Sequence, residues 1–183
     1  MDIEYINKLE NAYSLIYQAN MEMIRLWTRN TFLTWRWWLA LLLTIGPWIA
    51  WYFLRKKDST DRLLYAGLVV ALISSWMDVI GILFGLWSYH ADVVPFSPSF
   101  IPWDITLLPV SITLLIQYKP HVSPILKSVI YSGINSFVME PVLKWLGFYW
   151  PKHWEYYYSF PIYILIYLIA HYISSRSAFT KIG

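Results

Sequence analysis

The sequence predicts an all-α protein: a polytopic transmembrane helix bundle of about five spans, with an amphipathic helix at its N-terminus. Two observations support this fold class. Apolar residues make up 58% of the 183 residues and charged residues only 14%, whereas soluble domains carry about 25% charged residues. So few charges could not cover a soluble surface in a chain that also holds 12 Trp, 15 Tyr and 9 Phe. In addition, long uncharged runs recur along the chain, so the bilayer is the expected solvent.

Residues 1–33 are predicted to form an amphipathic helix at the membrane interface. Apolar side chains recur there at helical spacing between polar residues: Ile6, Leu9, Tyr13, Ile16 and Tyr17. Such a pattern without a long apolar run is typical of a helix that lies in the membrane surface. The segment also lacks the continuous apolar core of a cleavable signal peptide. Residues 34–183 are expected to form one transmembrane domain, since no repeat or linker divides them.

Five hydrophobic segments are expected to cross the membrane: 37–54, 63–89, 102–118, 122–147 and 156–175. The first has about 18 residues and reaches roughly 27 Å as a helix, close to the hydrocarbon thickness. Pro47 should bend it. The third is too short to cross alone, so the proline-rich stretch 93–103 before it is expected to be buried against protein.

Basic residues favour one orientation of these spans. Four bases follow the first span, namely Arg55, Lys56, Lys57 and Arg62. The positive-inside rule therefore predicts an N-out, C-in protein of the bacterial cytoplasmic membrane. Three other bases, Arg25, Arg29 and Arg36, would then lie outside.

Three acids lie within the predicted spans and are the candidate catalytic residues: Asp78, Asp104 and Glu140. A carboxylate near mid-membrane costs about 2.5 kcal/mol or more, so each needs a reason to be there. Asp78 shares a helix face with Gly81 and Gly85, whose spacing allows close helix approach. It should therefore face the bundle, either as a hydrogen-bonding contact between helices or as a proton donor.

The other two acids also have alternative interpretations. Asp104 lies at the expected start of the third span, where a carboxylate can cap free N–H groups. Glu140 precedes Pro141 and has Lys144 one turn ahead, which is the spacing of a local ion pair. If the three acids converge, burial and mutual repulsion should keep at least one protonated, as a proton donor requires.

Polar and aromatic residues near these acids are the candidate substrate-binding set: Trp87, Tyr89, Trp103, Gln117, Asn135 and Tyr149. Most of the other rings are assigned to packing and to interfacial belts. Aromatic faces close to an acid can stabilise a cation or stack on a flat ligand.

Several classes of function are disfavoured. The four histidines are isolated and no HExxH pair is present, so no metal site is expected. The absence of a DDxxD-type cluster and of a phosphate-binding glycine loop disfavours magnesium-dependent prenyl transfer, and no cofactor is expected. A net charge of +3 without a basic stripe argues against nucleic-acid binding. There is no cysteine for a disulfide or a thiolate.

Four motifs carry a resemblance to known proteins: Gly85-Leu-Trp-Ser-Tyr89, Pro102-Trp103-Asp104, Glu140-Pro141 and Ser159-Phe-Pro-Ile-Tyr163. Together they resemble a small family of bacterial polytopic integral membrane proteins, a resemblance that implies no activity. Trp87 and Pro102-Trp103-Asp104 also resemble a more distant group, the integral-membrane lycopene cyclases and related terpene cyclases. Those enzymes carry an acidic pair after the proline, whereas Ile105 follows Asp104 here. Asp78 or Glu140 would supply the second acid.

The leading expectation is therefore a cofactor-independent cyclase or isomerase of terpenoid or isoprenoid lipids. A buried acid, Asp104 or Glu140, would protonate an alkene or epoxide, a second acid would accept a proton, and aromatic faces would stabilise the cation. Two alternatives stay open: a non-enzymatic membrane subunit that binds a partner's span, and a small transporter. The sequence also leaves open whether the chain forms a homo-oligomer.

Overall fold

The computed structural model describes residues 2–97 and 99–176, and these are mostly helical, which confirms the all-α class. The order of helical elements is α1 (Ile3–Asn30), α2 (Trp35–Leu54), the short 3-10 helix η1 (Lys57–Ser59), α3 (Thr60–Leu83), the π-helix η2 (Pro102–Leu107), α4 (Leu108–Gln117), α5 (Pro124–Ile134), the π-helix η3 (Asn135–Met139), α6 (Glu140–Leu146) and α7 (Tyr156–Ser174). A two-stranded antiparallel sheet pairs β1 (Trp87–Tyr89) with β2 (Tyr149–Pro151).

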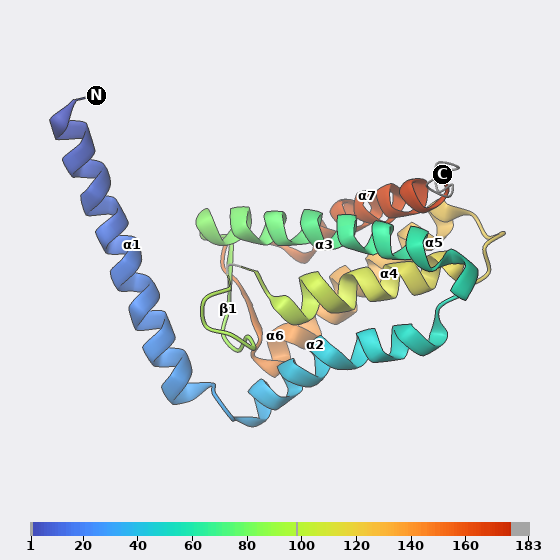
Figure 1. The fold of residues 1–183 in the computed structure, drawn as a ribbon, viewed down its shortest axis with the longest axis horizontal. Helices are drawn as coiled ribbons and strands as arrows, with labels where there is room; N and C mark the ends of the chain where they lie inside the picture. The colour runs from blue at the N-terminus through green and yellow to red at the C-terminus, as the bar shows by residue number, and fades with distance from the viewer. Residues whose placement is uncertain (1, 98, 177–183) are drawn as a thin grey trace, which may run out of the picture.

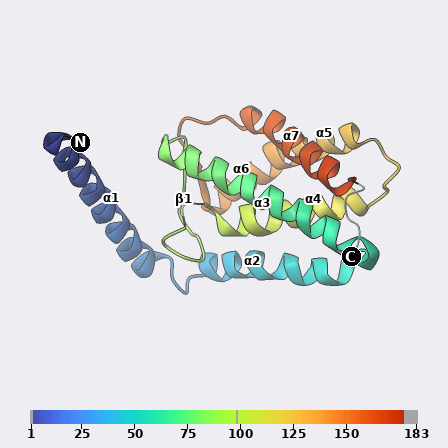
Figure 2. The same cartoon turned by 45° about the horizontal axis from the view of Figure 1, so that its top comes forward.

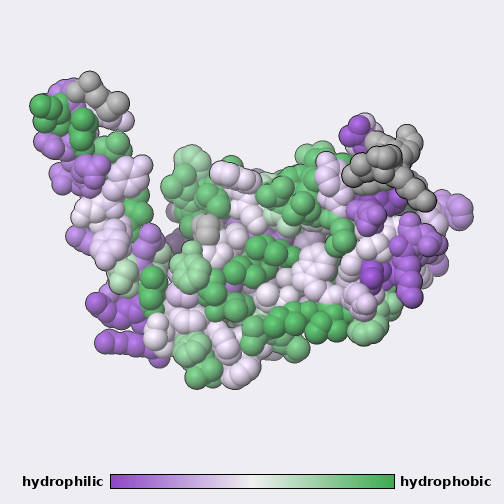
Figure 3. Space-filling view, viewed as in Figure 1, coloured by the Kyte–Doolittle hydropathy of each residue, from purple (hydrophilic) through white to green (hydrophobic). Residues whose placement is uncertain are grey.

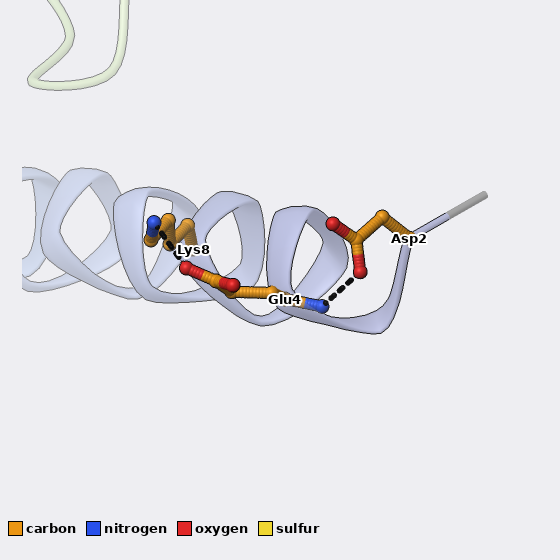
Figure 4. Close-up of polar contacts among 3 residues, drawn as sticks. All are labelled: Asp2, Glu4 and Lys8. Carbon is orange, nitrogen blue, oxygen red and sulfur yellow. Dashed lines mark hydrogen bonds and ion pairs between the residues drawn. The ribbon is translucent and has the colours of Figure 1, made fainter.

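Helix α1 stands apart from the rest of the molecule (Figures 1 and 2). Its first turn is capped by Asp2, whose carboxylate accepts the Glu4 N–H at 3.1 Å, and the Lys8 ammonium donates to Glu4 at 2.6 Å (Figure 4). No residue of α1 is buried. Its amphipathic pattern therefore leaves an apolar face without cover from the rest of the chain.

The remaining helices run side by side as a bundle (Figures 1 and 2). Each of the five segments expected to be hydrophobic spans is helical over most of its length, with α2, α3, η2–α4, α5–η3–α6 and α7 in that order. The second expected span, 63–89, corresponds to α3, which ends earlier than expected. It ends at Leu83, and Gly85 takes a left-handed φ of 67° that turns the chain. Residues 87–89 are consequently a strand and not the end of a helix.

One end of the bundle, which we call the basic end, consists of residues 54–62, 115–127 and 174–176. The Gln117 side chain donates to the Leu54 carbonyl at 2.9 Å and accepts the Lys56 N–H at 2.9 Å. The Lys127 ammonium donates to the carbonyls of Leu115 and Tyr118. These contacts satisfy carbonyls at helix C-termini, where cations and donors are favourable. The opposite end, which carries β1, β2 and loop 90–101, is called the strand end.

Proline explains how η2 is held between its neighbours. Pro109 has no N–H, so it cannot donate to the carbonyl of Ile105 four residues earlier, and the helical ladder loses one bond there. The Ser74 hydroxyl of α3 donates to the Asp104 carbonyl at 3.1 Å, and the Trp48 indole of α2 donates to the Ile105 carbonyl at 3.1 Å. The irregular turn that carries Asp104 is therefore bonded to helices on two sides.

Much of the bundle surface is apolar. Large hydrophobic side chains are exposed along its outer helices, for example Leu42, Ile49, Leu68, Leu72, Ile130 and Leu165. In Figure 3, hydrophilic residues gather on α1 and at the basic end, and apolar residues are spread over the bundle between them. Among the described residues, three helical segments are long and apolar enough to cross a membrane, namely Trp35–Leu54, Lys57–Leu83 and Tyr156–Ser174. An exposed apolar surface of this extent indicates membrane association.

Candidate functional site

The three acids of the predicted spans meet at one cavity. It has a volume of about 70 Å³ and lies between α3, η2, α6 and α7 toward the strand end. Its lining consists of Ser74, Met77, Asp78, Trp87, Tyr89, Trp103, Asp104, Leu108, Glu140, Leu143, Tyr149, Trp154, Ser159, Ile162, Tyr163 and Ile166. None of these is Lys, Arg or His, so no basic side chain in the described part of the chain neutralises the acids there.

Asp78 is the most heavily hydrogen-bonded of the three acids. Its Oδ1 accepts the Trp87 indole N–H at 3.1 Å and the Tyr89 hydroxyl at 2.9 Å, and its Oδ2 accepts the Phe100 N–H at 3.1 Å. These donors come from β1 and from Phe100, two residues before η2. Asp78 thus ties the end of α3 to the strand end, and none of the three bonds requires a proton on its carboxyl group.

Asp104 lies beside Asp78 and is only 2% exposed. Both carboxyl groups line the cavity with no basic side chain in its lining, and two buried like charges disfavour full ionisation of both groups. Asp78 already accepts three bonds, whereas Asp104 Oδ2 has no partner among the described residues. Asp104 is therefore the better placed of the two carboxyl groups to act as a proton donor, because donors from the protein already occupy Asp78.

Glu140 approaches the cavity from the opposite side. The Tyr163 hydroxyl donates to its Oε1 at 3.0 Å, and its Oε2 is buried without a partner in the described structure. The ion pair with Lys144 considered from the spacing is not formed; the Lys144 ammonium instead lies 5.6 Å from the ring centroid of Trp150. The carboxyl group of Glu140 is therefore not paired with Lys144 and is available to a ligand in the cavity.

Four of the predicted aromatic residues line the cavity: Trp87, Tyr89, Trp103 and Tyr149. The glycine predicted to allow close helix approach has a different neighbour. A Cβ on Gly81 would lie 2.0 Å from the Trp87 ring, so this glycine makes room for an indole from β1. Trp87 also packs edge-on against Trp154 with ring centroids 4.9 Å apart. The glycine–indole contact therefore fixes one aromatic wall of the cavity.

The two predicted amides lie elsewhere. Gln117 is at the basic end, where it bonds the end of α2. Asn135 donates to the Tyr131 carbonyl one turn back at 2.7 Å. Neither lines the cavity.

The cavity also contains two residues that the sequence analysis named only as the ends of a motif and not as site candidates. Tyr163 and Ser159 lie four residues apart on α7 and so share one face, and the Ser159 hydroxyl accepts the Trp154 indole N–H at 2.8 Å. The spacing of four residues between Ser159 and Tyr163 is visible in the sequence and indicates that the two side chains share one helix face.

A fourth acid, Asp92, lies in loop 90–101 close to these groups. Its carboxylate accepts the N–H groups of Val93 and Ile101. Burial raises the pKa of Asp92 to about 7, against the opposing effect of these two hydrogen bonds. No sequence pattern distinguished it from an ordinary loop acid.

Within residues 2–97 and 99–176, no group of three His, Asp or Glu side chains is arranged to hold a metal ion. Comparison with protein-family models, with curated proteins and with solved structures found no match for this chain.

Proposed function

We propose that the chain is an integral membrane protein that crosses the bilayer five times. Its basic end would lie in the cytoplasm, and α1 would lie on the extracytoplasmic surface of the same membrane. The exposed apolar side chains of the bundle and its three long apolar helices support this embedding. The basic end favours the cytoplasmic side because Arg55, Lys56, Lys57, Arg62 and Lys119 gather there. The uncovered apolar face of α1 fits a membrane surface.

The natural absence of cysteine allows a direct test of this topology. Single cysteines replace three exposed residues: Lys57 and His121 at the basic end and Lys152 at the strand end. In intact cells, a membrane-impermeant maleimide should label only Lys152→Cys, and all three should react after lysis. Labelling of His121→Cys from outside would contradict a third crossing by η2–α4, and labelling of Lys57→Cys would contradict the orientation.

We further propose that the cavity catalyses cofactor-independent proton transfer on a neutral isoprenoid-type lipid, a cyclisation or an isomerisation. The observation that carries this proposal is the convergence of three buried acids on an aromatic-lined cavity that holds no basic side chain. Asp104 would give its proton to an alkene carbon, which forms a C–H bond and leaves a carbocation. In a cyclisation, the π electrons of a second alkene of the same chain would form the ring C–C bond to this cationic carbon and move the positive charge to a new carbon. Asp78 or Glu140 would then take a proton from a carbon beside the charge, and the pair of electrons of that C–H bond would close the new alkene.

The lining also favours a neutral substrate over a diphosphate. A phosphate group would need Lys, Arg or a metal as a partner, and the cavity lining offers carboxyl groups instead. Trp87, Trp103 and Tyr149 present π-faces that can stabilise a carbocation. Leu108, Leu143 and Ile162 provide apolar contacts for the reacting end of a hydrocarbon chain, since a volume of about 70 Å³ holds only part of such a lipid.

Substitution of Asp104 by Asn tests this role, because the amide keeps the shape of the side chain but cannot act as the acid. Cells that express either protein are fed neutral polyprenyl precursors, and lipid extracts are separated by chromatography before mass spectrometry, since isomers share one mass. A product peak with the wild type should fall by at least about 100-fold in Asp104→Asn.

The control is Asp58→Asn, at an exposed position outside the cavity, which should keep the product. A folded Asp104→Asn protein with full turnover would exclude Asp104 as the acid. Identical extracts from wild-type and empty cells would contradict the proposed reaction.

A further inference from the structure

A row of buried hydroxyl groups leads away from Glu140 toward the basic end. Ser132 and Ser136 precede Glu140 at intervals of four residues, so the three side chains share one face of the continuous helix α5–η3–α6. Both serines are 0% exposed, and their hydroxyl oxygens have no hydrogen-bond partner among the described residues. The row therefore begins at the unpartnered oxygen of Glu140 and continues for two turns.

Helix α7 continues the same row from the opposite side. It packs against α5 and η3 and runs antiparallel to them (Figures 1 and 2). Tyr163 bonds Glu140, and the ring of Tyr167, one turn later on α7, lies 6.1 Å from that of Tyr131 on α5, centroid to centroid. The Tyr167 hydroxyl is also buried without a partner, and the same ring stacks on His171 at 6.4 Å between centroids. His171 is half-buried and lies a turn from the basic end.

Unpartnered hydroxyls in such positions call for water. Buried polar atoms in proteins are almost always hydrogen-bonded, and those without a protein partner are usually bonded to an ordered water. Ser128 lies one turn before Ser132 on α5 and provides a contrast. It is equally buried, but its hydroxyl donates to the Ile125 carbonyl at 2.8 Å. Along this face of α5–η3–α6, the unpartnered groups therefore end before the turn that carries Ser128.

We propose that waters bound along Ser132, Ser136 and Tyr167 form a proton path from the basic end to Glu140. A proton enters beside His171, each water or hydroxyl accepts one proton and passes on another, and the Glu140 carboxylate receives the last. Each group keeps its number of protons after a transfer, and its O–H bonds rotate back before the next one. The path deepens the proposed function, on which its biological purpose rests, because it would let Glu140 exchange a proton with the cytoplasmic side and so regain its starting charge between turnovers.

Exchange of the Glu140 proton for deuterium measures this path without any substrate. Full-length protein in nanodiscs is moved from H₂O to D₂O at a pH low enough to protonate Glu140, and infrared spectroscopy follows the carboxyl C=O band that is missing in Glu140→Gln. Ser136→Ala and Tyr167→Phe, which delete one hydroxyl each, should slow the exchange by at least about tenfold. Ser136→Thr should restore the rate because it restores the hydroxyl group.

Ser128→Ala is the matched control and should leave the exchange rate unchanged, since that hydroxyl already has a protein partner. An unchanged rate in the combined Ser136→Ala, Tyr167→Phe protein would overturn the path, and so would equal slowing by Ser128→Ala. The two proposals fail separately. Hydroxyl-dependent exchange without any lipid product supports the path and counts against the reaction, whereas a lipid product with hydroxyl-independent exchange does the reverse.

Discussion

Asp78→Ala is expected to lower the free energy of unfolding by about 3–5 kcal/mol, the range for removing one partner of a buried, charge-assisted network. The variant leaves three buried donors without an acceptor: the Trp87 indole, the Tyr89 hydroxyl and the Phe100 N–H. These donors hold β1 and the start of η2 against α3. We therefore expect the strand end to loosen first.

Unfolding of the purified protein in mixed micelles, followed by circular dichroism and by tryptophan fluorescence, measures this loss. Asp78→Asn should fall between the wild type and Asp78→Ala, because its amide oxygen still accepts hydrogen bonds while its NH₂ group opposes one of the donors. Glu10→Ala, on the exposed surface of α1, is the control and should have no effect. Wild-type stability in Asp78→Ala would show that the three bonds do not hold the strand end.

The helical segments and the buried position of the acids could be predicted because both follow from the cost of polar groups in an apolar surrounding. The residue at which α3 ends could not be predicted. The apolar run continues to Tyr89, and hydropathy alone does not distinguish the end of a helix from a short strand. The boundary is set by the left-handed φ of Gly85 and by the pairing of β1 with β2, which is distant in sequence.

The partners of the polar residues were harder to predict than the residues themselves. Spacing along one helix indicates which side chains share a face, but not what lies opposite them. Lys144 has the right spacing for Glu140 and instead lies near Trp150. Gln117 was expected at a ligand site and instead bonds the end of α2, because carbonyls at a helix C-terminus need donors. Convergence of the acids likewise depends on contacts between helices.

The contact of Gly81 with Trp87 leads to the second large prediction. Gly81→Ala is expected to lower the free energy of unfolding by about 2–4 kcal/mol, more than the usual cost of overpacking. The new methyl group would overlap the indole, so the ring must move. Moving it breaks the indole hydrogen bond to Asp78 and shifts the aromatic wall of the cavity.

A double-mutant cycle with Trp87→Phe separates this contact from a general effect of alanine in α3. The smaller ring relieves the overlap, so the cost of Gly81→Ala should shrink by at least about 1 kcal/mol in the Trp87→Phe background. Gly133→Ala is the matched control, because its Cβ would meet only a Phe160 ring atom at 3.9 Å. That helical glycine should tolerate alanine or gain up to about 1 kcal/mol. Strictly additive effects of Gly81→Ala and Trp87→Phe would mean that Gly81 acts through something other than the space it leaves for the indole.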